Sequence, residues 1–139
     1  MPDAAARGSR LIVIVEDAVG SASALELLLD GLANTKVRSF PNGSAAWMFL
    51  QSGDSPPVGA VVTDLDMPAV DGLELIRRMR SSTVHAHTPV IVVSATTEPA
   101  ASERALEAGA NVFFGKPWSP RKMRAALEQL LYGTETSGR

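Results

Sequence analysis

Short apolar runs alternate with longer amphipathic stretches along most of the chain. Three of the runs, at 11–15, 58–63 and 90–93, are almost continuously apolar, which is typical of strands covered on both faces of a parallel sheet. The segment Lys36–Phe40 alternates polar and apolar residues, which predicts a strand at the edge of that sheet. The five predicted strands are Leu11–Val15, Val37–Phe40, Val58–Thr63, Val90–Val93 and Val112–Phe114.

Each predicted strand is followed by a stretch that predicts a helix. In the first of these stretches the apolar residues recur every three or four positions and form one stripe, namely Leu25, Leu28, Leu29 and Leu32. The last stretch repeats this pattern, with Ser119 before it as the predicted N-cap and Pro120 at its first helical position. The stretch 98–108 has mostly alanine on its predicted inner face, so we expect this helix to be the most weakly anchored.

Five consecutive strand–helix units predict a doubly wound α/β fold, because parallel neighbouring strands require helical crossovers. The length of 139 residues suits a single domain of this kind. We expect the domain to span residues 10–132, and the small and polar residues of 1–9 and 133–139 to form flexible tails.

The composition excludes several classes of function. The chain has no cysteine, which excludes disulfides, thiolate zinc sites and cysteine nucleophiles. Its net charge of −2 removes the electrostatic basis for sequence-independent binding to nucleic acid. No apolar run approaches the roughly 20 residues that span a membrane, and Glu16 and Asp17 follow the first run where a signal peptide would have a cleavage site. We therefore expect a soluble cytoplasmic protein that does not insert into membranes.

Residues that carry chemistry follow the ends of four predicted strands. In an open parallel sheet the carboxyl ends of the strands form one rim, and ligands bind there. The residues expected at this rim are Glu16, Asp17, Asp64, Asp66, Asp71, Ser94 and Lys116. Taken singly, each has an ordinary structural explanation, because an aspartate often caps a helix, a serine often lies in a turn and a lysine is often exposed. Their joint occurrence at four strand ends favours a functional site.

The carboxylates at this rim predict a metal ion. Two carboxylates about 4 Å apart repel each other by roughly 4 kcal/mol at an effective dielectric constant near 20. Lys116 supplies a single positive charge, which cannot balance Glu16, Asp17 and Asp64. Oxygen ligands with room left for water suit Mg²⁺. A divalent cation would also let a phosphoryl group approach the site, where a carboxylate could act as the nucleophile.

In these residues the sequence resembles the receiver domains of bacterial two-component response regulators, of the stand-alone type found among chemotaxis regulators. The resemblance extends over about 10–132 and rests on VED at 15–17, DLDMPAVDG at 64–72, VIVVSA at 90–95, EAGA at 107–110 and GKP at 115–117. It implies a flavodoxin-like fold with five parallel strands in the order 2-1-3-4-5. It also implies a signalling domain that catalyses only its own phosphorylation and dephosphorylation, rather than an enzyme that turns over a substrate.

The resemblance implies a role for each acidic residue of the rim. Asp64 corresponds to the aspartate that accepts a phosphoryl group in an Mg²⁺-dependent reaction, and it also contributes to the metal site. Glu16 and Asp17 correspond to the acidic pair that holds Mg²⁺, with Asp17 as the direct ligand and Glu16 acting through water. The backbone carbonyl of Asp66 corresponds to the third contribution from the protein.

Four further positions match residues that respond to phosphorylation in this family. Lys116 corresponds to the lysine that pairs with the phosphate, and Pro117 to the proline after it, which is usually cis-bonded. Ser94 corresponds to the switch hydroxyl, and Phe113 to the switch aromatic. Phe113 stands in place of a frequent tyrosine and Ser94 in place of a commoner threonine, but neither departure removes a part that phosphoryl transfer needs.

The resemblance also implies protein partners. The donor would be a phosphohistidine of a sensor histidine kinase or a phosphotransfer protein, which usually docks on the first helix, where Leu27 lies off the apolar stripe. We expect phosphorylation to draw in Ser94 and Phe113 and to reshape the surface of the fourth helix, fifth strand and fifth helix, which would contact an effector protein in trans. A phosphorylation-dependent dimer is compatible with this reading, whereas direct binding to nucleic acid or to a membrane is not expected.

Three other functions remain open from the residues alone. Asp64-Leu65-Asp66 also fits a magnesium-dependent phosphohydrolase, although 139 residues leave little room for a cap domain. A flavin-binding module would need a phosphate loop where the chain instead has Glu16 and Asp17. A degenerate receiver that serves only as a scaffold would not need the intact acidic residues and Lys116.

We expect the remaining polar candidates to be solvated. His85 and His87 could bind a metal, but two histidines in a loop rich in serine and threonine are more simply explained as exposed side chains. Arg77, Arg78 and Arg80 are predicted to form a solvated basic face on the third helix.

Overall fold

The structure, a computed structural model, describes residues 10–29, 31–32, 35–53, 57–67, 70–96 and 98–133. In chain order its elements are β1 (Arg10–Val15), α2 (Val19–Leu29), β2 (Thr35–Phe40), α3 (Gly43–Leu50), β3 (Val58–Asp64), α4 (Gly72–Arg80), β4 (Val90–Ser94), α5 (Pro99–Ala108), β5 (Val112–Gly115), α6 (Pro120–Glu128) and η1 (Gln129–Gly133), a short π-helical turn. All five predicted strands are present and each is one or two residues longer than predicted. Strands β1 and β2 begin earlier, at Arg10 and Thr35, and β3, β4 and β5 end later, at Asp64, Ser94 and Gly115.

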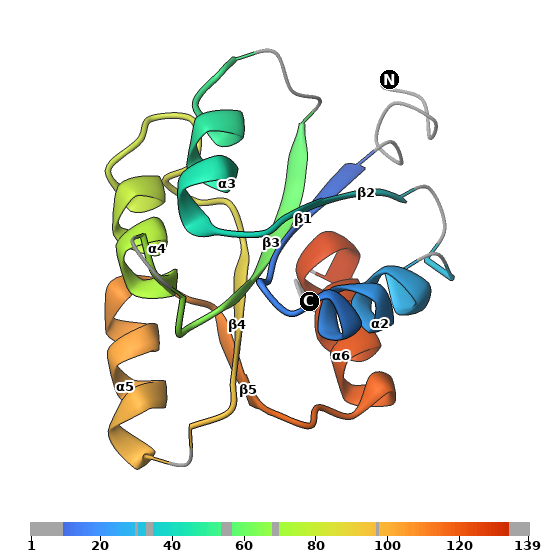
Figure 1. The fold of residues 1–139 in the computed structure, drawn as a ribbon. Helices are drawn as coiled ribbons and strands as arrows, with labels where there is room; N and C mark the ends of the chain where they lie inside the picture. The colour runs from blue at the N-terminus through green and yellow to red at the C-terminus, as the bar shows by residue number, and fades with distance from the viewer. Residues whose placement is uncertain are drawn as a thin grey trace.

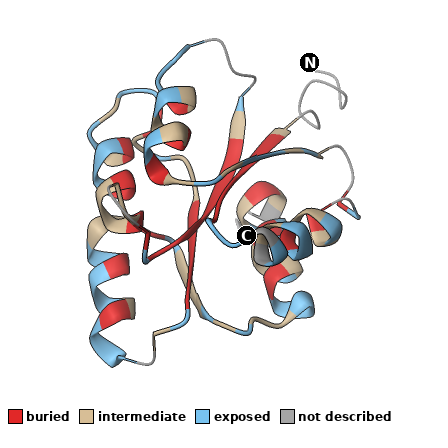
Figure 2. Ribbon diagram, viewed as in Figure 1, coloured by how far each residue is buried: buried red, intermediate tan, exposed pale blue. Residues whose placement is uncertain are grey.

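The strands form one parallel sheet in the order β2-β1-β3-β4-β5. Helices α2 and α6 cover one face of the sheet, and α3, α4 and α5 cover the other (Figure 1). This arrangement confirms the predicted flavodoxin-like, doubly wound fold and its strand order. It also explains the nearly continuous apolar runs, because both faces of each central strand are buried (Figure 2).

The side chains of β1 alternate between two hydrophobic cores. Leu11, Val13 and Val15 pack in the core beneath α3, α4 and α5. Ile12 and Ile14 pack in the core beneath α2 and α6. Each of these side chains is almost fully buried, and burial of such a side chain stabilises a fold by roughly 1.5–3 kcal/mol. The two cores therefore fix β1 in the sheet and hold the residues that follow it at the rim.

The predicted edge strand is β2, which has only β1 as a partner in the described sheet. Lys36, Arg38 and Ser39 are exposed, as an edge strand with a polar outer side requires. Helix α5 has the alanine-lined inner face that the sequence predicted, since its buried residues are Ala101 and Ala105. Small side chains of this kind make fewer dispersion contacts than leucine, so the buried face of α5 contributes little to anchoring the helix.

The helix starts follow the predicted chemistry where the structure describes the cap. The hydroxyl of Ser119 accepts a hydrogen bond from the backbone N–H of Lys122 at 3.2 Å, and Pro120 begins α6. The residues of the first predicted stripe are buried, except that Leu28 is half-buried, whereas Leu27 is 75% exposed.

The predictions that His85 and Arg80 would be solvated are wrong. The ring of His85 is buried, with Nε2 2.8 Å from the carbonyl oxygen of Leu50 and Nδ1 3.1 Å from the hydroxyl of Thr88. The guanidinium of Arg80 donates to the carbonyls of His85, Thr88 and Gly109 at 2.7–3.1 Å. Both side chains thus bond to backbone carbonyls at the ends of α3 and α5 and in the loop before β4, and these bonds keep them from being fully solvated.

The predicted tails fall largely outside the described residues. Residues 1–9 and 134–139 are not described, and Gly133, which was assigned to the second tail, is the last residue of η1. Within the described ranges, none of the helices combines the length and the apolar character that crossing a membrane would demand.

Candidate functional site

The carboxyl ends of four parallel strands bring the predicted polar residues to one rim of the sheet. Asp64 and Ser94 are the last residues of β3 and β4. Glu16 and Asp17 follow β1, and Lys116 follows β5. Because parallel strands end at the same edge, residues up to 100 positions apart in sequence become neighbours.

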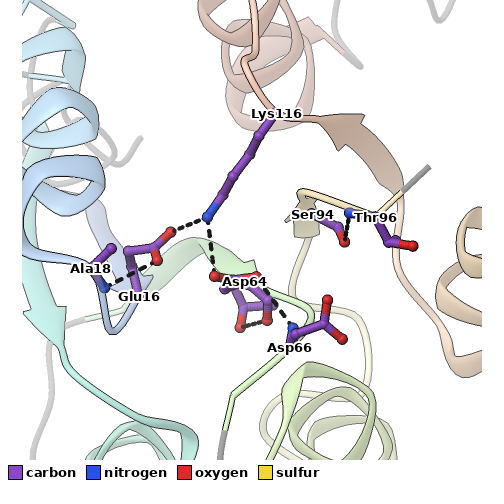
Figure 3. Close-up of polar contacts among 8 residues, drawn as sticks. Glu16, Ala18, Asp64, Asp66, Ser94, Thr96 and Lys116 are labelled. Atoms are coloured by element: carbon purple, nitrogen blue, oxygen red, sulfur yellow. Dashed lines mark hydrogen bonds and ion pairs between the residues drawn. The ribbon is translucent and has the colours of Figure 1, made fainter.

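Lys116 joins two of the acidic residues directly. Its Nζ lies 3.1 Å from Oε1 of Glu16 and 3.1 Å from Oδ2 of Asp64 (Figure 3). The side chain of Glu16 is 1% exposed and that of Asp64 9% exposed, whereas that of Lys116 is 22% exposed. The two carboxylates therefore lie at the floor of the site, and the Lys116 side chain that pairs with both of them is more exposed to solvent.

Burial and charge shift the pKa values of this cluster. Burial is the main cause that raises the pKa of Glu16, and the neighbouring Asp64 adds to it, while Lys116 and the N–H of Ala18 oppose it. Burial by itself would lower the pKa of Lys116, but the hydrogen bonds and charges of Glu16 and Asp64 together outweigh it, so the pKa is raised. Lys116 is therefore firmly cationic, as a residue that pairs with an anion must be.

The carboxylates fit a divalent cation. Glu16, Asp17 and Asp64 each offer an oxygen within 4.8 Å of the others. At such a separation two carboxylates repel by about 3 kcal/mol at an effective dielectric constant near 20. The ammonium of Lys116 balances one of the three charges, so an excess of two remains. Asp17 is exposed, which leaves the cluster open to water on one side, and a set of oxygen ligands with open positions is what Mg²⁺ prefers.

Asp64 is held firmly and is still reachable. The backbone N–H of Asp66 donates to Oδ1 of Asp64 at 3.2 Å, while Lys116 holds Oδ2. The hydroxyl of Thr63 donates to the backbone carbonyl of Asp64 at 2.9 Å, and that peptide is buried. These contacts orient the Asp64 carboxylate, and the 7% of the residue that is exposed leaves it accessible from the rim of the sheet.

Ser94 lies at the rim but takes part in a local turn. Its side chain is fully buried, and its hydroxyl accepts a hydrogen bond from the backbone N–H of Thr96 at 3.1 Å (Figure 3). The structure thus places Ser94 on the strand next to Asp64, with its Oγ engaged by its own loop.

The other two residues that the resemblance singled out flank Lys116. Phe113 is half-buried against the core beneath α3, α4 and α5. The bond between Lys116 and Pro117 is cis, as the resemblance implied.

Asp71 and Gly72 have structural roles that the sequence did not reveal. Asp71, expected at the rim, instead caps α4, since its carboxylate accepts from the N–H of Glu74 at 2.9 Å. Gly72 begins α4 directly against β3, where an added Cβ would lie 2.4 Å from the carbonyl oxygen of Asp64 and 3.0 Å from Cα of Leu65. The glycine in the sequence motif at 64–72 was the only signal of this close approach.

We expect Gly72→Ala to disturb the site through the backbone of Asp64. The new methyl group cannot avoid the Asp64 carbonyl unless α4 moves, and overpacking of this kind costs about 2 kcal/mol. Urea unfolding measures the loss. Gly20→Ala is the control, because nothing lies within 4 Å of its added Cβ in α2, and it should stabilise the protein by about 0.5 kcal/mol. Equal stabilities for the two variants would contradict the prediction.

Comparison with known proteins identifies similar chains. A family model described as the response regulator receiver domain matches residues 12–128. The cyclic di-GMP phosphodiesterase response regulator RpfG of Xanthomonas campestris is 33% identical over 121 residues, which cover 86% of this chain and 31% of RpfG. The chemotaxis protein CheY homolog of Campylobacter jejuni is 30% identical over 122 residues, which cover 86% of this chain and 91% of that protein.

Solved structures agree with this result. The signal receiver domain of a signal transduction histidine kinase from Syntrophus aciditrophicus superimposes with a TM-score of 0.78 at 30% identity. The superposition covers 89% of this chain and 91% of that one. The chain therefore spans about a third of the length of one relative and nine tenths of others.

Proposed function

The chain belongs to the response regulator receiver domain family, and we propose that it accepts a phosphoryl group on Asp64 from a phosphohistidine donor. Receiver domains are signalling domains of two-component systems. The observation that carries the assignment to Asp64 is its position: a nearly buried carboxylate, oriented by Lys116 and by the N–H of Asp66, beside two further acidic residues.

In the proposed reaction an oxygen of the Asp64 carboxylate attacks phosphorus. A P–O bond forms and gives an acyl phosphate, while the P–N bond to the donor histidine breaks. The electron pair of that bond stays on the imidazole nitrogen, which then takes a proton from water. The ammonium of Lys116, already 3.1 Å from Asp64, is placed to pair with an oxygen of the arriving group.

We propose that the carboxylates of Glu16, Asp17 and Asp64 and the backbone carbonyl of Asp66 hold Mg²⁺, with Glu16 acting through water. The cluster of oxygen donors and its excess of negative charge support this choice. When bound, Mg²⁺ neutralises negative charge on the carboxylates and on the phosphoryl group. The residues of the chain orient the carboxylate that reacts and supply the ammonium.

The Asp17→Asn substitution is expected to separate metal binding from folding. Without metal, loss of an exposed charge that only repels its neighbours should stabilise the fold by up to about 1 kcal/mol. With Mg²⁺, the wild-type protein should gain stability and the variant should gain much less, because ligand binding stabilises the folded state by mass action. Thermal unfolding with and without MgCl₂ checks this. An equal gain in Tm for both proteins would contradict a role for Asp17 in holding the metal.

The proposed function is tested by mixing the protein with Mg²⁺ and a small-molecule phosphodonor such as acetyl phosphate, and then measuring the intact mass. We expect a gain of one phosphoryl group that depends on Mg²⁺ and is lost on chelation with EDTA. Failure to gain mass would reject the proposal. Catalytic release of phosphate from an ester well beyond one equivalent would instead support a phosphohydrolase.

We further propose that phosphorylation moves Ser94 and Phe113. The phosphoryl group adds about −1.5 to −2 charge and strong acceptor oxygens beside the strand that carries Ser94. The oxygen of Ser94 accepts a hydrogen bond from the N–H of Thr96, and rotation of the side chain towards the phosphoryl group, so that its O–H donates there, would break that bond. Phe113 would then fill the vacated space and shift α5, whose alanine-lined inner face offers little resistance.

NMR with a phosphate mimic checks the proposed switch. We expect backbone shift changes in α5, β5 and α6 of the wild-type protein. Ser94→Ala should still take up the mimic but show clearly smaller changes there, because it has no hydroxyl to donate. Ser44→Ala, a partly exposed serine of α3, should behave like the wild type. Unchanged shifts on α5, β5 and α6 of the wild-type protein would contradict the proposal.

The partners follow from this chemistry. A sensor histidine kinase or phosphotransfer protein would supply the phosphohistidine, with the exposed Leu27 of α2 as a candidate contact. An effector protein would read the surface of α5, β5 and α6, and a dimer formed on phosphorylation could use the same surface. We place the reaction in the cytoplasm, where such donors present their phosphohistidine.

A further inference from the structure

A groove between α3 and α4 lies away from the proposed phosphorylation site. Helix α4 begins beside Asp64 at Gly72, whereas the groove extends along the helix from Glu74 to Ser81 and Ser82 beyond its C-terminus. It has a volume of about 390 Å³ and is lined by Trp47, Glu74, Arg77, Arg78, Ser81 and Ser82. None of these residues takes part in the proposed transfer of the phosphoryl group.

The groove continues into a second hollow of about 500 Å³. Trp47 and Ser82 line both hollows and thus stand between them. The walls of the second hollow include Leu50, Pro57 and Val58, and the exposed side of Val84, which is 75% exposed, borders it. The two hollows together form a surface with arginines at the end beside α4 and several apolar side chains at the end beside the loop before β4.

The basic end carries a charge that is not neutralised. Arg78 pairs with Glu74 at 3.0 Å, but no carboxylate in the described part of the chain lies within ion-pair distance of Arg77. Arginines in the last turn interact favourably with the helix dipole, which explains why α4 has them there. The dipole does not explain the aromatic and apolar residues that lie beside these arginines.

The neighbouring helix α3 has no charged residue and exposes Met48, which is 68% exposed. Tryptophan, methionine and arginine are enriched at protein interfaces, where aromatic and arginine side chains contribute most of the binding energy. Trp47 and Arg77, which both line the groove, therefore give it the composition of a docking surface.

We propose that the groove binds an acidic segment of a partner protein. A carboxylate of that segment pairs with Arg77, and a bulky apolar side chain a few residues away enters the hollow between Trp47 and Val84. The small size of the groove corresponds to a short peptide segment and a transient complex rather than to a permanent interface.

Two other occupants fit less well. The groove has Arg77 and Arg78 against the single acidic residue Glu74, so a second copy packed symmetrically on it would bring two surfaces of net positive charge together, and like charges repel across an interface. An anionic membrane is flat, whereas this surface is hollowed. A side chain that reaches into a hollow suits the shape better than a planar surface does.

The proposal is tested with a fluorescently labelled peptide of alternating glutamate and aspartate around a central Leu-Phe pair. We expect fluorescence anisotropy to show binding that weakens as salt increases. Arg77→Glu and Val84→Asp should each reduce the affinity about tenfold, and both positions are exposed, so the fold should be retained. Arg121→Glu, the same charge change at an exposed position of α6, is the matched control and should bind like the wild type.

The same assay identifies the outcomes that would overturn the proposal. It is overturned if the peptide does not bind, or if Arg77→Glu and Arg121→Glu weaken binding equally, because the attraction would then be general. It is also overturned if the protein cosediments with phosphatidylserine vesicles in an Arg77-dependent manner but ignores the peptide, since the surface would then bind membranes. A peptide with its acids replaced by glutamine and asparagine should bind about tenfold more weakly, and equal binding of this peptide would contradict the role of Arg77.

Discussion

Asp64→Asn protein is expected to gain no phosphoryl group under conditions in which the wild-type protein gains one. The amide is nearly the same size as the carboxylate, so the substituted side chain can still accept the hydrogen bond from Asp66 and contact Lys116. It lacks the anionic oxygen that forms the bond to phosphorus, and a neutral amide is a poor nucleophile. Intact mass after incubation with Mg²⁺ and acetyl phosphate measures the difference.

The matched control is Asp71→Asn. Asp71 lies in the same sequence motif but caps α4, and asparagine caps a helix as well as aspartate does. This variant should therefore fold and gain the phosphoryl group like the wild type. Phosphorylation of the Asp64→Asn protein at the wild-type level would show that another residue is the acceptor and would reject the assignment.

Replacement of Lys116 by alanine is expected to destabilise the metal-free protein by about 2–3 kcal/mol. The variant leaves Glu16 and Asp64 next to each other and nearly buried, with no cation between them. Loss of one partner of a buried ion pair typically costs about 3–5 kcal/mol, and a lower figure applies here because water reaches the lysine, whose side chain is 22% exposed. Urea unfolding in the presence of EDTA measures the loss.

The pH dependence of this loss has a defined sign. The pKa of Glu16 is already raised above its ordinary value of 4.5, chiefly by burial, and Lys116 is among the groups that oppose this shift. In the Lys116→Ala protein the pKa of Glu16 should rise further, so the folded state binds a proton that the unfolded state releases. The stability of the variant relative to the wild type should therefore fall as pH rises above 4.5 and recover at lower pH.

Lys122→Ala, which removes an exposed lysine of α6, is the control and should change stability by less than about 0.5 kcal/mol. Mg²⁺ should restore more stability to the Lys116→Ala protein than it adds to the wild type, because the cation replaces the missing positive charge. If Lys116→Ala were as stable as Lys122→Ala without metal, the two ion pairs would contribute nothing to the fold.

The fold could be predicted because its signal is local and repeated. The apolar runs at 11–15, 58–63 and 90–93 have no polar side, so both faces of these strands must be covered by helices. Helices α2 and α6 cover one face of the sheet, and α3, α4 and α5 cover the other. The alternating run at 36–40 likewise became the edge strand β2. In each case the burial of a strand determines which of its positions are apolar, so the pattern of apolar residues reveals how many of its faces are covered.

Residues whose surroundings come from distant segments were predicted less well. Arg80 follows Ile76 by one helical turn and could be read as part of the basic face, but its partners include the carbonyl of Gly109, a residue 29 positions away. His85 likewise contacts the carbonyl of Leu50, 35 positions earlier. No periodicity in the sequence marks such contacts, because they depend on how the ends of α3, α4 and α5 and the loop before β4 meet.

The sequence alone determined the alternation of strands and helices, the rim at which the acidic residues gather and the chemistry that those residues permit, because hydrophobic periodicity and residue type are properties of the chain itself. The tertiary structure decided which oxygens Lys116 holds, that Asp71 caps a helix instead of joining the site, and that Gly72 must be small against the Asp64 carbonyl. It also created the groove beside Trp47, which exists only where α3, α4 and the loop before β4 meet. Distances of this kind are set by packing between segments far apart in sequence, and packing acts only in the folded chain.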